Sequence, residues 1–164
     1  MRVIPLTQGK QAVVDDEDFD LLMGMGRWCA MKLGGKFYAY KGKWLPSEHR
    51  TRHIAMHRLL CGLVWGDPRV VDHINGDGLD NRRANLRVCS RAQNQANGVG
   101  RTRTSRFKGV SLDMRSGKWL AQCKRNKWLG RFSTEHEAAI AYNRAALFEF
   151  GEFARLNSLG REGG

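Results

Sequence analysis

The stretch that decides the fold runs from Val70 to Asn94 and reads VVDHINGDGLDNRRANLRVCSRAQN. Residues 69–73 and 86–88 have the short apolar character of strands, and a loop rich in Asn, Asp and Gly separates them. Ser90 is a favourable N-cap for a helix over residues 91–97. The segment therefore predicts a strand, a loop, a second strand and a helix in close succession.

Three side chains of this segment are of the types that a one-metal phosphodiester hydrolase needs. One divalent ion can hold the scissile phosphate and stabilise the leaving oxygen. Mg²⁺ prefers oxygen ligands and keeps several waters, so the Asp72 carboxylate and the Asn94 amide suffice as protein ligands. The imidazole of His73 titrates near neutral pH and can deprotonate water. Because neighbouring strand residues point to opposite faces, Asp72 and His73 converge only if the strand ends or bends between them, and the following Asn75-Gly76 favours such a break.

The charge of the chain points to a polyanionic partner. The net charge is +12, from 28 basic and 16 acidic residues. The excess is local: residues 101–131 carry ten Lys or Arg and one acid, Asp113, whereas residues 1–55 carry nine basic and six acidic residues. Nucleic acid is the first candidate partner, and an anionic membrane surface is the second. A solvated basic face without a partner is the alternative.

The cysteines and the apolar runs exclude several classes of protein. Cys29, Cys61, Cys89 and Cys123 are far apart and form no CxxC pair, which argues against a zinc site and a disulfide scaffold. No run approaches membrane-spanning length, and the N-terminus has no apolar signal core. We therefore expect a soluble cytoplasmic protein with reduced thiols and no membrane partner.

The central segment resembles the HNH endonucleases of the ββα-metal class, in particular the homing endonucleases. The resemblance covers residues 57–97 with several fixed spacings. It rests on four motifs: HRL at His57–Leu59, DHING at Asp72–Gly76, LDNRRANLR at Leu79–Arg87 and RAQN at Arg91–Asn94. It implies a metal-dependent DNA endonuclease of a bacterial or phage-infected cell, and it assigns no role to His57.

The resemblance also implies a role for each site residue. His73 would be the general base, and Asp72 and Asn94 would be ligands of one Mg²⁺ or Mn²⁺ ion. Asn85 would brace the loop or orient His73, and Arg91 would hold the scissile phosphate. Taken singly, each residue also has a structural explanation, since Asn-Gly and Asp-Gly are ordinary turn formers and an arginine can simply solvate a helix.

Residues 105–157 resemble the DNA-binding domain of the APETALA-type and ethylene-response plant transcription factors. The resemblance rests on GV at Gly109-Val110, WLGRF at Trp128–Phe132, EAAIAY at Glu137–Tyr142 and LN at Leu156-Asn157. It implies a three-stranded antiparallel sheet packed on one helix, with the sheet in the major groove of double-stranded DNA.

The residues themselves favour the same arrangement. Short strands are expected over residues 107–112, 118–124 and 127–132. The capping box TEHE at Thr134–Glu137 begins a helix that ends at Phe150, before Gly151. In the middle strand, period-two alternation separates a helix-facing set from a DNA-facing set. The first set is Trp119, Ala121 and Cys123, and the second is Lys118, Gln122 and Lys124.

The expected DNA contacts come from this sheet and from the basic linker before it. Ser111 and Asp113 stand where the plant family commonly has arginines, so base readout should differ from that family. The residues expected to contact DNA are Arg101, Arg103, Arg106, Lys108, Lys118, Gln122, Lys124 and Trp128. Core packing is the alternative for Trp128.

The whole chain is therefore expected to be an α+β protein: a ββα-metal HNH core, a β-rich segment before it, and the sheet-and-helix module after it. The helix before the core is expected over residues 56–64. The expected parts are an accessory region at 1–55, the nuclease module at 56–97, a linker at 98–106, the DNA-binding domain at 107–157 and a tail at 158–164.

We expect a site-preferring homing-type nickase that acts on double-stranded DNA as a monomer or homodimer, without a small-molecule cofactor. One alternative is a DNA-binding regulator with a relic HNH fold. Another is a phage or bacterial restriction or packaging nuclease, which has the same chemistry and another biological role.

Overall fold

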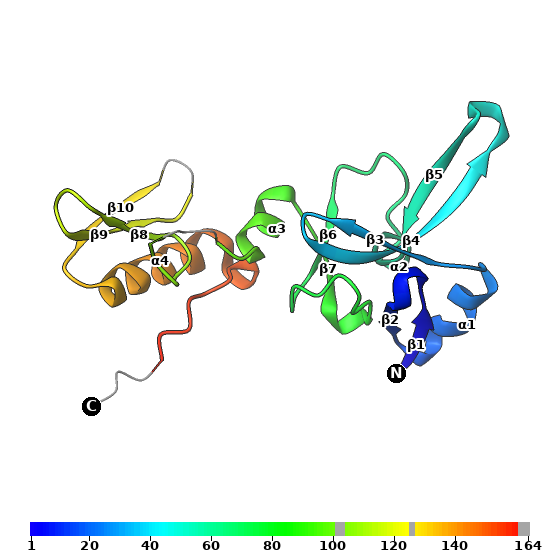
Figure 1. Cartoon of the computed structure of the whole chain (residues 1–164), viewed down its shortest axis with the longest axis horizontal. Helices are drawn as coiled ribbons and strands as arrows, with labels where there is room; N and C mark the ends of the chain where they lie inside the picture. The colour runs from blue at the N-terminus through cyan, green and yellow to red at the C-terminus, as the bar shows by residue number, and fades with distance from the viewer. Residues whose placement is uncertain (101–103, 125–126, 161–164) are drawn as a thin grey trace. The chain divides into compact units, whose positions relative to one another are not determined.

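The computed structural model describes residues 1–100, 104–124 and 127–160. The fold is mixed α/β, with several small antiparallel sheets and few helices (Figure 1). Two compact units divide the chain, one at 1–94 and the other at 95–164. Within the described ranges, no helix is both long and apolar enough to cross a membrane.

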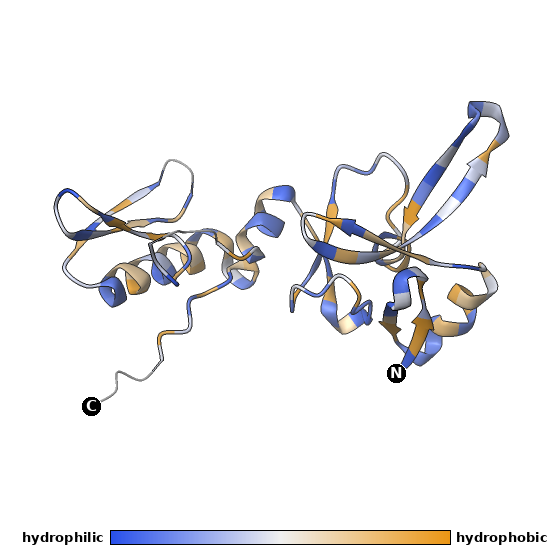
Figure 2. Cartoon of the chain, viewed as in Figure 1, coloured by the Kyte–Doolittle hydropathy of each residue, from blue (hydrophilic) through white to orange (hydrophobic). Residues whose placement is uncertain are grey.

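The first unit begins with a two-stranded sheet and a helix. Strands β1 (Arg2–Pro5) and β2 (Gln11–Val14) pair antiparallel, and α1 (Asp16–Gly24) follows. Three acidic residues in the first turn of α1 suit the positive end of a helix. Both strands carry hydrophobic residues (Figure 2). The core of this part contains Ile4, Val14, Leu22 and Trp28, all at most 1% exposed.

A three-stranded sheet follows in the order β3-β4-β5 (Cys29–Leu33, Lys36–Leu45 and Arg50–Ala55). Gly34 and Gly35 both have positive φ, as the tight turn between β3 and β4 requires. Strand β4 extends as far as Leu45, because β5 pairs with it over that length. The outer part of this β4–β5 hairpin is mainly hydrophilic (Figure 2), so apolar patterning gives no sign of it.

Helix α2 (Met56–Leu60) is shorter than the expected helix over 56–64. Gly62 has a φ of 67°, and Leu63 donates its amide hydrogen to the carbonyl of Arg58. A left-handed glycine with this bonding pattern terminates a helix. The apolar spacing beyond Leu60 therefore belongs to a loop.

The central segment folds as β6 (Val70–His73), a long loop, β7 (Leu86–Cys89) and α3 (Arg91–Asn97). The strands pair antiparallel, with Asp72 opposite Arg87 and His73 opposite Leu86. Ser90 caps α3: its hydroxyl accepts from the Gln93 amide at 3.2 Å, and the Gln93 side chain accepts from the Ser90 amide at 2.8 Å. The predicted N-cap is confirmed.

The second unit contains the antiparallel sheet β10-β9-β8 and helix α4 (Glu135–Phe150). The strands are β8 (Val110–Asp113), β9 (Lys118–Gln122) and β10 (Trp128–Phe132). Helix α4 begins with the predicted capping box between Thr134 and Glu137. Short 3-10 turns complete the chain at Thr7–Gly9, Pro46–Glu48, Arg83–Asn85 and Gly151–Phe153.

The core of the second unit lies between α4 and the sheet. It contains Phe107, Val110, Ala121, Ala138 and Ala139. Strand β8 starts later than expected because Gly109 has a φ of 72° and lies directly against the ring of Tyr142, where a side chain would clash. The helix face buried against the sheet contains Ala138, Ala139, Tyr142 and Ala146. Ala141 and Ala145 of the same helix are only partly buried.

Candidate functional site

The end of β6 places two ionisable side chains in a nearly closed environment. Asp72 is 4% exposed and His73 is 5% exposed. Oδ2 of Asp72 accepts from Nε of Arg87 at 2.9 Å and from Nη2 at 2.8 Å. Sequence reasoning missed Arg87 as a site residue. Its position opposite Asp72 follows from the antiparallel register, so pairing the two strands residue by residue would have found it.

Asn85 braces the loop between β6 and β7. Its Oδ1 accepts from the Asn75 amide at 3.0 Å. Its Nδ2 donates to Oδ1 of Asn75 at 3.1 Å and to the carbonyl of Asp80 at 2.8 Å. The Asn85 carbonyl accepts from the Ile74 amide at 2.9 Å. This bonding is the kind that a brace requires, and it closes the loop directly beyond His73.

The N-terminal sheet also holds the loop. Val13 of β2 accepts from the Asn81 amide at 2.7 Å and donates to the carbonyl of Leu79 at 2.9 Å. Arg83 forms a two-point contact with the buried carboxylate of Asp18 in α1, at 2.7 and 2.8 Å. The β-rich region therefore contributes structure to the site, a role that its sequence does not reveal.

His73 lies among aromatic rings and carboxylates. Its ring centroid is 5.1 Å from that of His57 and 5.8 Å from that of Tyr38. Burial lowers the pKa of His73, and part of the loss is countered by a hydrogen bond with Asn81 and by the charges of Asp72, Asp77 and Asp80. The imidazole is therefore neutral at neutral pH, which is the form that accepts a proton from water.

His57 and Tyr38 complete this cluster. His57 is 8% exposed, and burial, with the charges of His73 and Arg58, lowers its pKa to about 3. Tyr38 comes from β4, and the loop packs so tightly on its ring that a Cβ at Gly78 would lie 2.5 Å from it. The motifs gave His57 no role, and nothing in the sequence pattern singled out Tyr38.

Asp72 and Asn94 are brought together around Cys89. Burial raises the pKa of the Cys89 thiol, while hydrogen bonds from the backbone N–H groups of Asp72 and Asn94 counter part of the rise. The backbones of Asp72 and Asn94 therefore both lie near this thiol. The side chain of Asn94 is exposed on α3, and Arg91 is exposed at the start of that helix.

The donor set around this point suits a hard cation. Asp72 and Asn94 offer a carboxylate and an amide oxygen, and Mg²⁺ or Mn²⁺ accepts such ligands together with several waters. In the ranges that the structure describes, no group of three or more His, Cys, Asp or Glu side chains is arranged to hold a metal.

The second unit presents a mixed set of candidate DNA contacts. Lys118 and Gln122 are exposed on β9, and Trp128 is 55% exposed on β10. Core packing, the alternative for Trp128, is therefore excluded. Lys124 and Lys127 both pair with the carboxylate of Glu149 in α4, the latter at 2.9 Å. That pairing compensates part of their charge.

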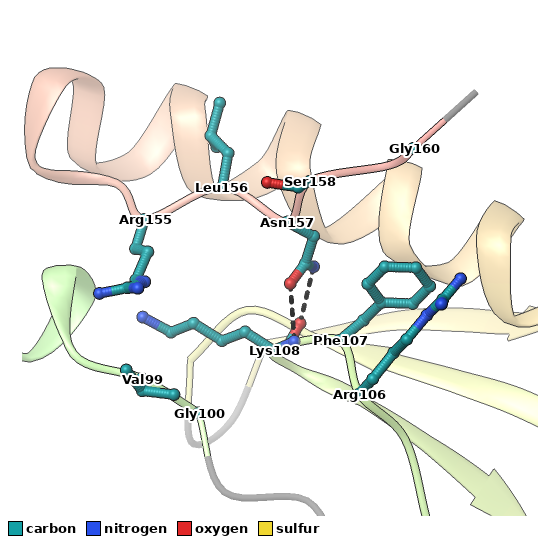
Figure 3. Close-up of a pocket in the computed structure, with 10 residues that line it drawn as sticks. All are labelled: Val99, Gly100, Arg106, Phe107, Lys108, Arg155, Leu156, Asn157, Ser158 and Gly160. Carbon is teal, nitrogen blue, oxygen red and sulfur yellow. Dashed lines mark hydrogen bonds between the residues drawn. The ribbon is translucent and has the colours of Figure 1, made fainter.

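Lys108 is engaged within its own unit. Its ammonium donates to the carbonyl of Gly98 at 2.6 Å and to that of Ala96, at the last turn of α3. Burial lowers the pKa of Lys108, and the nearby charge of Arg155 lowers it further. Figure 3 shows the side chain of Lys108 extending toward the 99–100 segment, with Arg155 beside it.

The remaining candidates lie at the edge of this region. The guanidinium of Arg106 lies over the ring of Phe107, 4.8 Å from its centroid. Arg101 and Arg103 fall outside the described residues. Figure 3 also explains the LN motif: Asn157 exchanges two hydrogen bonds with the backbone of Lys108, at 2.7 and 3.1 Å. Its own backbone bonds with the side chain of Asn143, at 2.7 and 2.9 Å, and so ties the tail to α4.

Comparison with known families confirms the first resemblance. Residues 37–96 match the family model described as HNH endonuclease. The match contains Asp72, His73, Asn85, Arg91 and Asn94. It also extends upstream over β4, the strand that supplies Tyr38.

Comparison with curated proteins confirms the second resemblance. The chain is similar to "Dehydration-responsive element-binding protein 2E" of Arabidopsis thaliana, with 43% identity over 65 residues, covering 32% of this chain and 26% of that protein. It is also similar to "APETALA2-like protein 2" of Oryza sativa subsp. japonica, with 40% identity over 60 residues, covering 35% of this chain and 14% of that protein. The chain thus spans about a quarter or less of these relatives. No solved structure matches it.

Proposed function

We propose that this protein is a divalent-metal-dependent DNA endonuclease that hydrolyses phosphodiester bonds. The observation that carries the proposal is the placement of the buried Asp72 and His73 at the end of β6, with the backbones of Asp72 and Asn94 beside the same Cys89 thiol, inside the segment that matches the HNH endonuclease family. On this proposal, β6, the braced loop, β7 and α3 form the ββα-metal core.

Each residue then has one task. His73, neutral through burial, accepts a proton from the attacking water. Asp72 and Asn94 hold the divalent ion, and Arg91 on the exposed start of α3 contacts the scissile phosphate. The bound ion supplies charge stabilisation at the phosphate and at the leaving oxygen. Asn85 and Arg87 position this group: Asn85 fixes the loop, and Arg87 fixes the carboxylate of Asp72.

The second unit supplies the grip on double-stranded DNA. Lys118, Gln122 and Trp128 lie on its sheet with exposed side chains, which suits contact with a groove and its phosphates. One active centre cuts one strand, so the expected product is a nick. A homing-type nickase acting in the cytoplasm of a bacterial or phage-infected cell, as a monomer or homodimer, is the biological setting we favour; restriction or packaging would use the same chemistry.

The second candidate function is a DNA-binding regulator with a relic nuclease fold. It is favoured by the similarity to proteins whose names describe element-binding proteins and transcription factors. Intact Asp72 and His73, both buried in a well-packed site, argue against it, because a relic site is free to lose such buried ionisable groups.

Nicking of supercoiled plasmid in Mg²⁺ or Mn²⁺ tests the proposal. We expect the wild type to produce open-circular DNA, EDTA to stop the reaction, and His73→Ala to lose nicking by at least about a hundredfold, as loss of a general base predicts. His49→Asn is the matched control, since His49 is exposed and its left-handed backbone tolerates Asn. DNA binding measured in EDTA should be unchanged in both variants.

Two outcomes would contradict this reading. A pure wild-type protein that binds DNA but cuts no substrate with either metal would favour the regulator. Equal nicking by His73→Ala and the wild type would remove His73 from the reaction.

A further inference from the structure

The first unit contains a groove that the nuclease site does not use. It has a volume of about 720 Å³ and is lined by residues of β4 and β5 and of the segment after α2. Its apolar lining includes Tyr40, Leu45, Ile54 and Trp65, and its cations include Lys43 and Arg52. Trp65 is 66% exposed, so its indole is open to a ligand that enters the groove.

The wall that carries Trp65 is fixed in place. The guanidinium of Arg58 donates to the carbonyl of Arg69 at 2.8 Å, to that of Val64 at 3.1 Å and to that of Asp67 at 3.2 Å. One side chain thus clamps both ends of the segment around Trp65. The backbone that carries the indole is thereby held, which lowers the conformational entropy lost when a ligand stacks on the ring.

Arg52 extends this plate on the hairpin side. Its guanidinium lies 4.9 Å from the centroid of the Trp65 ring, and its Nε donates to Oε2 of Glu48 at 3.2 Å. Lys43 lies directly opposite Arg52 in the β4–β5 register. An aromatic surface, a guanidinium stacked on it and an ammonium therefore all line the groove.

The positive charge of the groove lining favours a negatively charged partner. All charged side chains among the described residues that line the groove are basic; Glu48 pairs with Arg52 but is not part of the lining. Flat rings that alternate with negative charges complement such a surface, and they are the chemistry of a single nucleic-acid strand. A duplex keeps its bases stacked inside and cannot place a ring in the groove.

We propose that this groove binds an unpaired stretch of DNA, with one base stacked on Trp65 and the flanking phosphates on Lys43 and Arg52. The binding itself does not depend on the nuclease activity. Only the source of the strand, an opened segment beside the cleavage site, rests on the proposed function.

The test measures binding of a fluorescent oligothymidylate and of a duplex of equal length, by anisotropy in EDTA so that nothing is cut. Trp65→Ala should weaken single-strand binding roughly tenfold, and Trp65→Phe should restore most of it. Lys43→Ala should weaken it less. Trp44→Ala is the matched control: Trp44 is an exposed indole on the same hairpin, but it is not part of the groove lining. Duplex binding should be the same in all variants.

Equal single-strand affinity of Trp65→Ala and Trp44→Ala would overturn the proposal. So would displacement of the oligothymidylate by polyglutamate as effective as by unlabelled strand, which would point to an acidic protein partner. The result is independent of plasmid nicking: a failure of the nuclease proposal leaves the anisotropy difference intact, and a failure of the groove leaves nicking by Trp65→Ala intact.

Discussion

His73 and His57 are two buried histidines whose pKa values are shifted by different neighbouring charges. Their rings are 5.1 Å apart, and burial lowers the pKa of both. His73 has carboxylates and Asn81 nearby, which raise its pKa in part, whereas the charges next to His57 are cationic and lower its pKa further. A residue that must accept a proton needs the first environment, and a residue that only packs tolerates the second.

His57 should make the stability of the protein depend on pH. Its folded pKa is about 3 and its usual value is 6.5, so the unfolded chain binds the proton more tightly. Stability is therefore unaffected above pH 6.5 and falls as the pH drops from 6.5 toward 3. Between pH 7 and pH 4 this group should cost on the order of 3 kcal/mol.

Urea unfolding of the wild type and of His57→Gln at several pH values checks this prediction. The variant should be less stable at pH 7, because it disturbs the packing, but its loss of stability on acidification should be clearly smaller. If the free energy of unfolding falls equally with pH in both proteins, the pKa of His57 is not lowered in the folded state.

At this scale the sequence motifs mark candidate site residues, and they leave out the residues that support them. The resemblance implied that Asn85 braces the loop or orients His73, and its hydrogen bonds with Asn75 and Asp80 are those of a brace. Arg87 required the register of two strands, and Tyr38 required knowledge of which strand packs on the loop. Such long-range packing leaves no mark on local spacing.

At the scale of elements, local signals located most helices and strands. The capping boxes at Ser90 and Thr134 begin α3 and α4, and Gly34-Gly35 closes the β3–β4 hairpin. The errors have local causes as well. Gly62 ends α2 early, and the hydrophilic outer hairpin of β4 and β5 lacks the apolar alternation that identifies strands.

Lys108 was expected to contact DNA, but its side chain bonds with the end of helix α3. Its ammonium caps the carbonyl end of α3, where a cation is favourable. Lys108→Met should lower stability by about 1–3 kcal/mol, because two carbonyls lose a charged donor, and it should change DNA affinity little. Lys118→Met is the matched control, since Lys118 is exposed on β9.

Thermal melting and anisotropy with duplex DNA separate the two roles. The control should lose affinity and keep its melting temperature. If both variants lose the same affinity and melt like the wild type, Lys108 contacts DNA as its motif position implies.

At the scale of the whole molecule, the net charge predicted a nucleic-acid partner. The chain divides into two units, and we propose that one cuts DNA and the other binds it. The ten basic residues between 101 and 131 lie in the part that is not the candidate nuclease. The acidic residues of α1 are partly used to hold the nuclease loop through Arg83. Net charge alone could not reveal that the acids of residues 1–55 have this structural use.

This distribution predicts that affinity and catalysis can be separated. Removing residues 101–164 should weaken duplex binding more than tenfold, because most phosphate contacts come from the cations of that segment. The single-turnover nicking rate at saturating protein should change little.

The affinity of the full-length protein for duplex DNA should fall by about three to five decades between roughly 50 and 200 mM salt if roughly six to ten phosphates are contacted. The truncated protein should show a much shallower salt dependence. Circular dichroism must show that the truncated chain keeps its strands, because the last turn of α3 loses Lys108. Equal affinity and an equal salt slope for the two proteins would place the DNA grip in residues 1–100 instead, and the sheet of the second unit would need another partner.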